Sequence, residues 1–191
     1  MLTTRRLFLR PFRRYDLAFL DRLHSDPAVT RFLGTGDVRS RADNRRWLEN
    51  TLAAYDTGVG QFLVCKADTG EPIGRCGVSR YQIEHAGRLS EVFFGGPPRP
   101  GCDSGLELGY TLLQRAWRQG YATEAAEAVR DHAYTEFDAP RLISLIATGN
   151  DASMRVSTKL GFYPQQNAVY RGVLCVITAR QRQTDRLATA C

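Results

Sequence analysis

ELGYTLLQRAWRQGYATEA, residues 107–125, gives the strongest indication of how this chain folds. Its first part is rich in apolar residues and predicts a strand over 106–113, which leads through a short polar connection to Gly120. The positions on one helix face after that glycine are small and apolar: Ala122, Ala125, Ala126, Val129 and Ala133. The stretch therefore predicts a strand followed by a helix that packs closely on a sheet.

The remaining segments extend this pattern into an α/β (α+β) layered domain. Apolar patterns predict strands over 4–12, 61–66, 72–81 and 141–148, and a last hairpin or strand over 169–179. Helices are expected over 16–24, after Asp26-Pro27, over 40–57 and over 150–160, with Asp16, Ser40 and Asn150 as capping residues. Residues 83–103 show no clear pattern, and their glycines and prolines at 95–101 predict a long loop. We expect one domain over 1–180 and a polar tail over 181–191.

Length and composition exclude several classes of protein. The chain has 191 residues, of which 43% are hydrophobic and 24% are charged, as in an ordinary globular domain. No run of 18 apolar residues predicts a membrane span, and the N-terminal residues do not form a secretory leader. The five cysteines form no CxxC pair and no histidine stands at zinc-ligand spacing. We therefore expect free thiols, no metal, no membrane association and a cytoplasmic location.

The net charge of +6 lies entirely in the first quarter of the chain. The first 46 residues hold 11 arginines and 5 aspartates, and the rest of the chain is balanced. An arginine bias of this kind is typical of a GC-rich coding sequence. Direct binding of nucleic acid is not expected, because aromatic residues do not interleave with the basic ones.

The turn at Gly120 predicts an anion site. The first amides of a helix lack partners within the helix and carry partial positive charge, so phosphates bind there readily. Gly120 and Ala122 are small enough for a diphosphate to approach the backbone, and Arg115 and Arg118 add positive charge. The chain has neither the Gly-Lys-Ser/Thr of a P-loop nor the three glycines of a dinucleotide fingerprint. The alternative is a plain left-handed turn before a helix.

Three segments resemble the GNAT superfamily of acyl-CoA-dependent N-acetyltransferases, and more narrowly its RimJ/RimL-type branch of ribosomal-protein N-terminal acetyltransferases. Residues 117–122, WRQGYA, fill the family's Gln/Arg-x-x-Gly-x-Gly/Ala frame, with Trp117 in the first position. Residues 150–162, NDASMRVSTKLGF, resemble the segment after the family's fifth strand, and residues 4–12 resemble its first strand. The resemblance covers roughly residues 3–180.

This resemblance implies a GNAT fold and acetyl-CoA as co-substrate. The fold is a mixed, mostly antiparallel central sheet of about six or seven strands, with helices on both faces and a splayed pair formed by the fourth and fifth strands. The strand that pairs with the pantetheine amides is implied to be Leu108, Gly109, Tyr110 and Thr111. The amides that hold the diphosphate are implied to be those of Arg118, Gln119, Gly120, Tyr121, Ala122 and Thr123, with Arg115, Asn150 and Ser153 close to the co-substrate.

The charges that develop during acetyl transfer indicate three catalytic residues. An amine must lose a proton before it attacks a thioester, and we expect Glu107 to take it, with Glu91 as a weaker alternative. An amide at Tyr110 or its neighbour is expected to stabilise the oxyanion, and Ser153 to give a proton to the thiolate. Many family members place a tyrosine where Ser157 stands here. The sequence leaves open whether Glu107 points away from the co-substrate and whether Ser153 only bonds locally.

We therefore expect direct transfer of an acetyl group to a primary amine, by a monomer or a homodimer. The acceptor is a protein N-terminus, such as that of a ribosomal protein, or a small amine such as an aminoglycoside or polyamine. The alternative is a catalytically silent acyl-CoA-binding sensor or interaction module. The acceptor pocket is implied to involve 16–57, 83–103 and 163–180, where Glu84, Glu91 and Asp103 either attract a cationic amine or are solvated. The arginine-rich first quarter disfavours strongly cationic acceptors.

Overall fold

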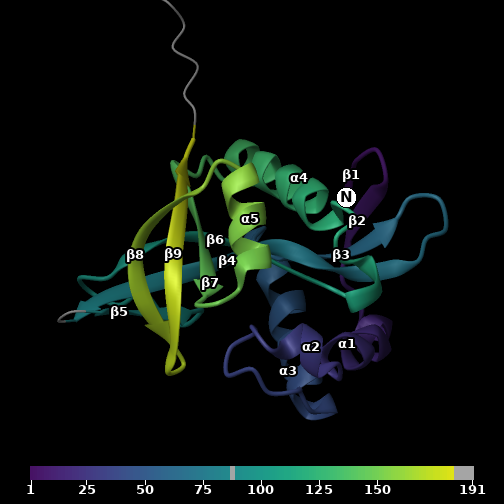
Figure 1. Cartoon of the computed structure of the whole chain (residues 1–191), viewed down its shortest axis with the longest axis horizontal. Coiled ribbons are helices and arrows are strands. Elements are labelled where there is room, and N and C mark those ends of the chain that lie inside the picture. The colour runs from purple at the N-terminus through teal and green to yellow at the C-terminus, as the bar shows by residue number, and fades with distance from the viewer. Residues whose placement is uncertain (87–88, 183–191) are drawn as a thin grey trace, which may run out of the picture.

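The computed structural model describes residues 1–86 and 89–182, and they form a curved sheet with helices on both faces (Figure 1). The strands are β1 (Leu2–Thr3), β2 (Leu7–Pro11), β3 (Gln61–Lys66), β4 (Pro72–Ala86), β5 (Leu89–Phe94), β6 (Asp103–Leu112), β7 (Arg141–Ala147), β8 (Tyr163–Tyr170) and β9 (Val173–Gln181). The α-helices are α1 (Leu17–His24), α2 (Pro27–Thr30), α3 (Arg41–Ala54), α4 (Tyr121–Glu136) and α5 (Asp151–Lys159). Short 3₁₀ turns lie at Arg14–Asp16, Tyr55–Thr57 and Gln114–Ala116.

The long strand β4 joins two parts of the sheet. Its first half pairs with β3, its second half pairs with β5, and β6 runs antiparallel along its other edge. The order β4-β5-β8-β9-β7-β6 closes on itself through β4 and β6, so six strands form a barrel and β1 to β3 extend from it. The pairings of β5 with β8 and of β6 with β7 are parallel, and the other pairings are antiparallel. The expected mixed, mostly antiparallel sheet is confirmed.

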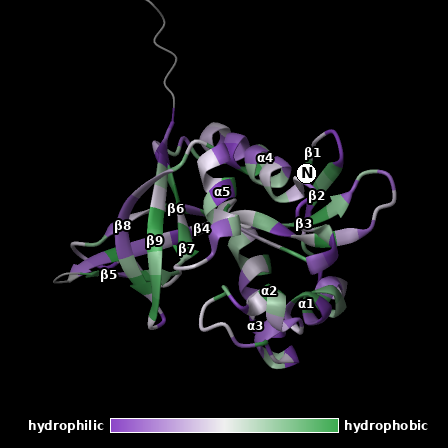
Figure 2. Cartoon of the chain, viewed as in Figure 1, coloured by the Kyte–Doolittle hydropathy of each residue, from purple (hydrophilic) through white to green (hydrophobic). Residues whose placement is uncertain are grey.

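The helices cover opposite faces of the sheet because strand residues alternate in direction. Helix α4 packs its fully buried Ala125, Ala126, Val129 and Ala133 on β4 and β6, together with alternate strand residues such as Leu106 and Leu108. Helices α1 and α3 pack on the other face, over Leu63 and Cys65 of β3. In Figure 2 β9 is largely hydrophobic and β8 largely hydrophilic, while α4 carries hydrophilic residues on its outward side. The small face predicted for α4 thus permits its close approach.

The predicted helix starts are confirmed with one exception. The side chains of Asp26, Ser40 and Asn150 accept hydrogen bonds from amides in the first turns of α2, α3 and α5. Asp16 precedes α1 but does not cap it through its side chain. Its carboxylate pairs with Arg10 at 2.7 Å and accepts the amide of Arg13, because a 3₁₀ turn precedes the helix.

The expected number of strands was too low. The sheet has nine strands, because residues 83–94, expected as an irregular segment, continue β4 and form β5. Charged residues within this hairpin, and the mostly exposed polar residues of β8, conceal the alternation that marks a strand. The glycine- and proline-rich segment 95–101 is a loop, as predicted.

The last strand includes the first residue of the predicted tail. Gln181 ends β9 by pairing with Arg141, and the amide of Arg182 donates to the carbonyl of Pro140. The remainder of the predicted tail, 183–191, lies outside the described residues. Within the described part of the chain, no helix has the length and apolar character needed to cross a membrane.

Candidate active site

The turn before α4 presents a row of backbone amides. Arg118 and Gly120 both have positive φ, 59° and 82°, which turns the chain sharply into the helix. Among residues 1–86 and 89–182, no backbone carbonyl accepts a hydrogen bond from the amides of residues 118–123. The next amide, that of Glu124, donates a hydrogen bond to the carbonyl of Gly120 at 3.1 Å and so begins the helical pattern. A group of unpaired amides at a helix N-terminus can hold an anion such as a diphosphate.

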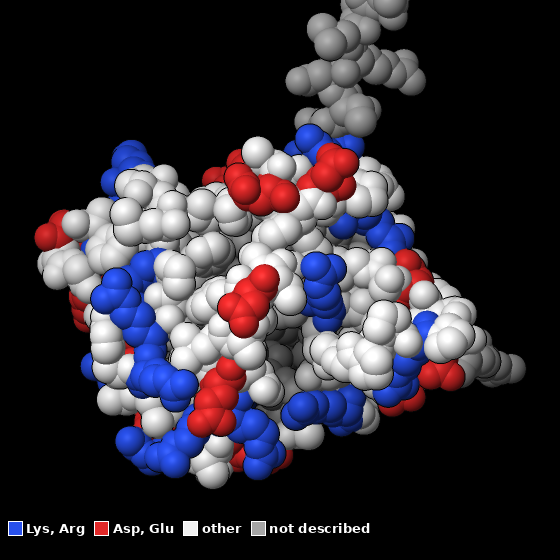
Figure 3. Space-filling view, turned by 180° about the vertical axis from the view of Figure 1, so that it is seen from behind, with Lys and Arg blue, Asp and Glu red and all other residues white. Residues whose placement is uncertain are grey.

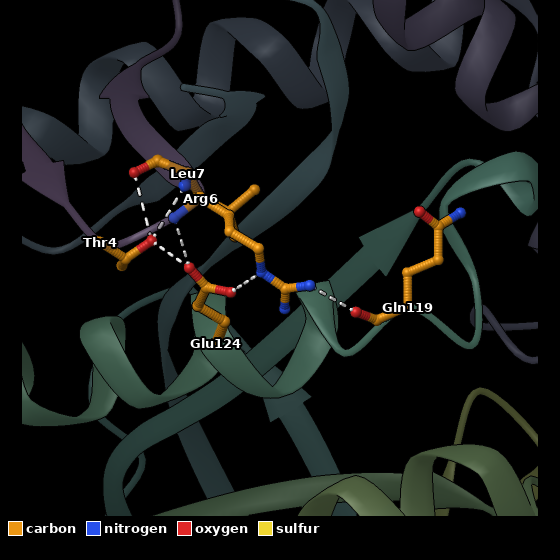
Figure 4. Close-up of polar contacts among 5 residues, drawn as sticks. All are labelled: Thr4, Arg6, Leu7, Gln119 and Glu124. Carbon is orange, nitrogen blue, oxygen red and sulfur yellow. Dashed lines mark hydrogen bonds and ion pairs between the residues drawn. The ribbon is translucent and has the colours of Figure 1, made fainter. Parts of the chain in front are cut away.

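An ion-pair network from the start of the chain holds this turn in place (Figure 4). The carboxylate of Glu124 accepts from the hydroxyl of Thr4 at 2.7 Å, from the amide of Arg6 at 2.8 Å and from Nε of Arg6 at 2.7 Å. The guanidinium of Arg6 continues to the carbonyl of Gln119 at 2.9 Å and lies over the ring of Tyr121. No pattern along the chain indicates this role for Arg6, because its partners lie about 115 residues away.

Two more residues before the turn, Arg115 and Trp117, have partners elsewhere in the chain. Arg115 pairs with Glu71 at 2.6 Å, and Glu71 also pairs with Lys66 at 3.0 Å. The indole N–H of Trp117 donates to the carbonyl of Leu112 at 2.8 Å, although the side chain is 40% exposed. Trp117 therefore fixes the end of β6 relative to the turn, and the charge of Arg115 is partly neutralised.

Strands β6 and β7 separate shortly after they pair. Their ladder contains only Leu106 with Leu142 and Glu107 with Ile143. At the next step the hydroxyl of Ser144 donates to the carbonyl of Leu108 at 2.5 Å. A side chain thus replaces the main-chain ladder, and the β6 edge beyond it diverges from β7. An extended ligand with amide groups can pair with such an edge.

Glu107 lies at the point where the two strands separate. Its carboxylate is buried and leans along β6 over Gly109, where an added Cβ would lie 3.2 Å from Oε2. Burial raises the pKa of Glu107 to about 7, while hydrogen bonding from the Leu145 backbone and the charge of Arg75 oppose the rise. A carboxyl group with this pKa can accept a proton near neutral pH.

The other expected catalytic residues lie on the opposite face of β6. Alternation points the side chain of Tyr110 away from Glu107, and its hydroxyl donates to the carbonyl of Ser153 at 3.4 Å. Burial raises the pKa of Tyr110 to about 12. Ser153 lies in the first turn of α5, where its amide donates to Oδ1 of Asn150. Ser157 is buried and its hydroxyl bonds to that of Thr178 at 2.8 Å, so it has a structural partner.

The acidic residues of segment 83–103 have different surroundings. Glu84 and Glu91 stand opposite each other on β4 and β5, where Glu84 lies 3.7 Å from Arg99 and Glu91 is exposed. Asp103, at the start of β6, pairs with Arg141 at 2.6 Å.

His132, on α4, does not face the solvent. The ring is half-buried and packs edge-on against Phe62 and Phe137. It serves the packing of α4 on β3 and lies away from Glu107.

The described cysteines are unpaired thiols. Cys65 and Cys76 are both buried, but they belong to cores on opposite faces of the sheet, so they do not face each other across the hairpin. Burial raises the pKa of the Cys65 thiol to about 11. Cys102 lies in the loop before β6. Cys191 lies outside the described residues.

A six-stranded barrel with an N-terminal extension, strands that splay beside a buried carboxylate, and an open helix N-terminus together define a GNAT-type acyltransferase. Residues 6–163 match the family model described as an acetyltransferase (GNAT) domain. The chain belongs to this family and is an acyltransferase.

Individual relatives agree with this assignment. The protein YkkB of Bacillus subtilis is 32% identical over 164 residues, 85% of this chain and 84% of YkkB. The crystal structure of an acetyltransferase from Agrobacterium tumefaciens covers 95% of this chain and 94% of its own, with a TM-score of 0.71 and 25% identity. The ribosomal L7/L12 acetyltransferase RimL, solved with coenzyme A, has a TM-score of 0.68 and covers 93% of this chain and 95% of its own. At 16% identity, RimL shares the fold.

Proposed function

We propose that this enzyme transfers an acetyl group from acetyl-CoA directly to a primary amine. The observation that carries the proposal is the position of Glu107 at the divergence of β6 and β7, on a strand that leads to the open amides before α4. One continuous segment thereby offers a base, a free strand edge and an anion site.

Acetyl-CoA fits these elements in order. The amides of residues 118–123 would hold its diphosphate, and the free edge of Leu108 to Thr111 would pair with the pantetheine amides. Gly120 supports this fit because its φ is 82° and a Cβ added to it would lie 3.2 Å from Nη2 of Arg6, so a side chain would be strained there. The co-substrate supplies a thioester whose carbonyl carbon is open to attack. We place Asn150 and Ser153 beside the pantetheine end.

The chain's own groups manage the protons of the reaction. Glu107 takes the proton of the amine, and the amine nitrogen forms a C–N bond as the C–S bond of the thioester breaks. The released thiolate takes up a proton, and a thiol with a pKa of about 8.5 needs little help to leave. The amide of Tyr110 or its neighbour is proposed to stabilise the carbonyl oxygen, and Ser153 to deliver the thiolate's proton.

The acceptor is proposed to be a protein N-terminus, as in the RimJ/RimL-type branch, or a small amine, in the cytoplasm. The name of RimL states a ribosomal protein as the substrate of that enzyme, and its likeness to this chain supports the first option only through the fold. The basic first quarter of the chain argues against polyamines in either case.

A second candidate is a silent acyl-CoA sensor on the same fold. One observation favours it: the position of the family's tyrosine holds Ser157, which is buried against Thr178. Release of thiol from acetyl-CoA, measured over a panel of peptide N-termini and small amines, tests the two. Turnover with any amine above the hydrolysis rate supports the transferase, while tight CoA binding without turnover on every amine supports the sensor.

A further inference from the structure

A buried polar group on the Glu107 face of the sheet lacks its partners. Of the buried side-chain atoms in the described residues, three have no hydrogen-bond partner: Nε2 of His24, Nε of Arg75 and Oγ1 of Thr111. Arg75 and Thr111 stand opposite each other on β4 and β6. Residues 107, 109 and 111 alternate onto one face, so Thr111 shares that face with Glu107. Buried polar atoms are normally paired, so this concentration indicates a place for a ligand.

Arg75 is a buried cation without an ion-pair partner among residues 1–86 and 89–182. Its side chain is 9% exposed, lies over the ring of Trp47 at 5.0 Å, and donates from Nη1 to the amide oxygen of Gln61 at 3.1 Å. Burial lowers the pKa of Arg75 to about 10, and the charge of Glu107 opposes this only in part. A buried guanidinium held by a neutral amide alone retains capacity for an anion.

A second cation, Arg39, lies on the loop between α2 and α3 and is linked to Arg75 through His24 and Trp47. The His24 ring lies 6.3 Å from that of Trp47, over which Arg75 packs, and the charge of Arg39 contributes to the lowered pKa of Arg75. The amide of Arg39 donates to the carbonyl of His24 at 3.2 Å, which fixes this loop beside α1. Figure 3 shows a hollow near the centre of one face of the molecule, with both basic and acidic side chains around it. Within the described part of the chain neither Arg39 nor Arg75 has an ion-pair partner. Unpaired cations away from water are costly, and an oxyanion would offset that cost.

His24 does not add a third charge. Burial lowers its pKa to about 3, so the ring is neutral. Asn44 donates from Nδ2 to Asp21 at 2.9 Å and therefore offers Oδ1 to Nδ1–H of His24, at 2.8 Å. Nε2 then carries a lone pair that can accept an N–H or O–H. The rings of His24 and Trp47 lie 6.3 Å apart, and Arg75 lies over the same Trp47 ring, so a neutral acceptor stands near the buried cation.

The offset along β6 indicates a short ligand. The carboxylate of Glu107 leans over Gly109, and the row of Arg75 and Thr111 lies two residues further along β6. Two residues of strand span about 7 Å, the length of a chain of a few bonds. We propose, resting on the acetyl transfer above, that the acceptor is a primary amine bearing a carboxylate or phosphoryl group, which Arg75 and Arg39 bind while its amine lies at Glu107.

The test compares acceptors that differ only in charge. The small probes are 4-aminobutyrate and 3-aminopropylphosphonate against 4-aminobutanamide, and the peptide probes, both amidated at the C-terminus, are Ala-Asp-Ala against Ala-Asn-Ala. We measure kcat/KM for thiol release from acetyl-CoA, and the Kd of each probe for the CoA-bound protein by calorimetry. We expect each acidic probe that fits to exceed its amide by about 10- to 100-fold, as charge-assisted bonds do. The probe pair with the larger ratio of acidic to amide acceptor shows whether the oxyanion belongs to a small molecule or to a peptide side chain.

Variants separate anion binding from a structural role. Arg75→Gln is expected to remove the preference and to leave the Kd for CoA unchanged, while Arg75→Lys retains part of it. Arg39→Gln changes a half-buried loop residue and is expected to reduce the preference for acidic probes as well. It serves as the test if Arg75→Gln fails to fold. Arg45→Gln is the matched control, because Arg45 is exposed on α3.

The outcomes distinguish this proposal from the one on which it rests. Transfer without preference for the acidic probes overturns the anion site and keeps the transferase. Absence of transfer to every probe overturns the proposed function. The calorimetric Kd values of acidic and neutral probes then test the anion site independently of turnover. Equal binding of acidic and neutral probes, or a preference that survives Arg75→Gln and Arg39→Gln, contradicts the anion site.

Discussion

Replacing Glu107 with glutamine tests the buried carboxylate by two independent properties. The pKa of Glu107 rises from 4.5 to about 7 in the folded chain, mainly through burial. The protonated form therefore stabilises the fold below pH 4.5, and this contribution is lost as the pH rises through 7. A rise of that size corresponds to about 3 kcal/mol at most. Glu107→Gln, which keeps the shape and removes the charge, should be as stable as wild type near pH 4.5 and more stable by up to about 3 kcal/mol at pH 8.

The same substitution should reduce catalysis in a pH-dependent way. About one tenth of the Glu107 side chains are ionised at pH 6 and about nine tenths at pH 8, so wild-type kcat should rise roughly tenfold between them. The variant lacks a base and should be about 10²- to 10⁴-fold slower at pH 8, with little of that rise left. Urea unfolding at both pH values and thiol release with a neutral peptide amine measure the two effects.

Glu91→Gln is the matched control, since Glu91 is exposed on β5 and should leave both properties near wild type. If Glu107→Gln is less stable than wild type at pH 8, the carboxylate is stabilised by its neighbours and its raised pKa is refuted. If the variant keeps the wild-type rate and pH profile, Glu107 is not the base.

Three further substitutions test the other elements of the site. Gly120→Glu adds a side chain at φ 82° and a negative charge at the amide row, so CoA affinity by calorimetry should fall at least 100-fold; an unchanged affinity would remove the anion site. Glu124→Gln weakens the bonds to Thr4 and Arg6, and should lower the free energy of unfolding by about 2 kcal/mol in urea titrations and weaken CoA binding. Ser153→Ala should slow transfer without changing CoA affinity, and a full rate would leave Ser153 with its local role in the first turn of α5.

Local patterns in the sequence predict much of this protein. The small face after Gly120 and the capping residues Ser40 and Asn150 depend on contacts within a few residues, so they can be predicted from local sequence. The WRQGYA frame indicates the family, and the match over 6–163 confirms it. The sequence also singles out position 107, but it leaves the orientation of that side chain open.

The polar strands and the network around the turn are beyond this kind of prediction. Strands β5 and β8 contain exposed charged or polar residues and lack a clear hydrophobic alternation. The pairing that closes the barrel through these strands therefore could not be predicted from the sequence pattern. Arg6 reaches Glu124 across 118 residues of chain. A contact of this kind exists only once the sheet brings the two segments together.

Patterns along the chain were sufficient for the fold family, the helix that begins at Gly120 and the place of Glu107 on a strand. The burial and raised pKa of Glu107, and the gathering of Arg75, Arg39 and His24 on its face, emerged only from the folded molecule. The one advance sign was a charged residue, Arg75, within the otherwise small and apolar strand 72–78. Helix and strand patterns arise from neighbours in the chain, whereas desolvation and charge interaction depend on neighbours in space.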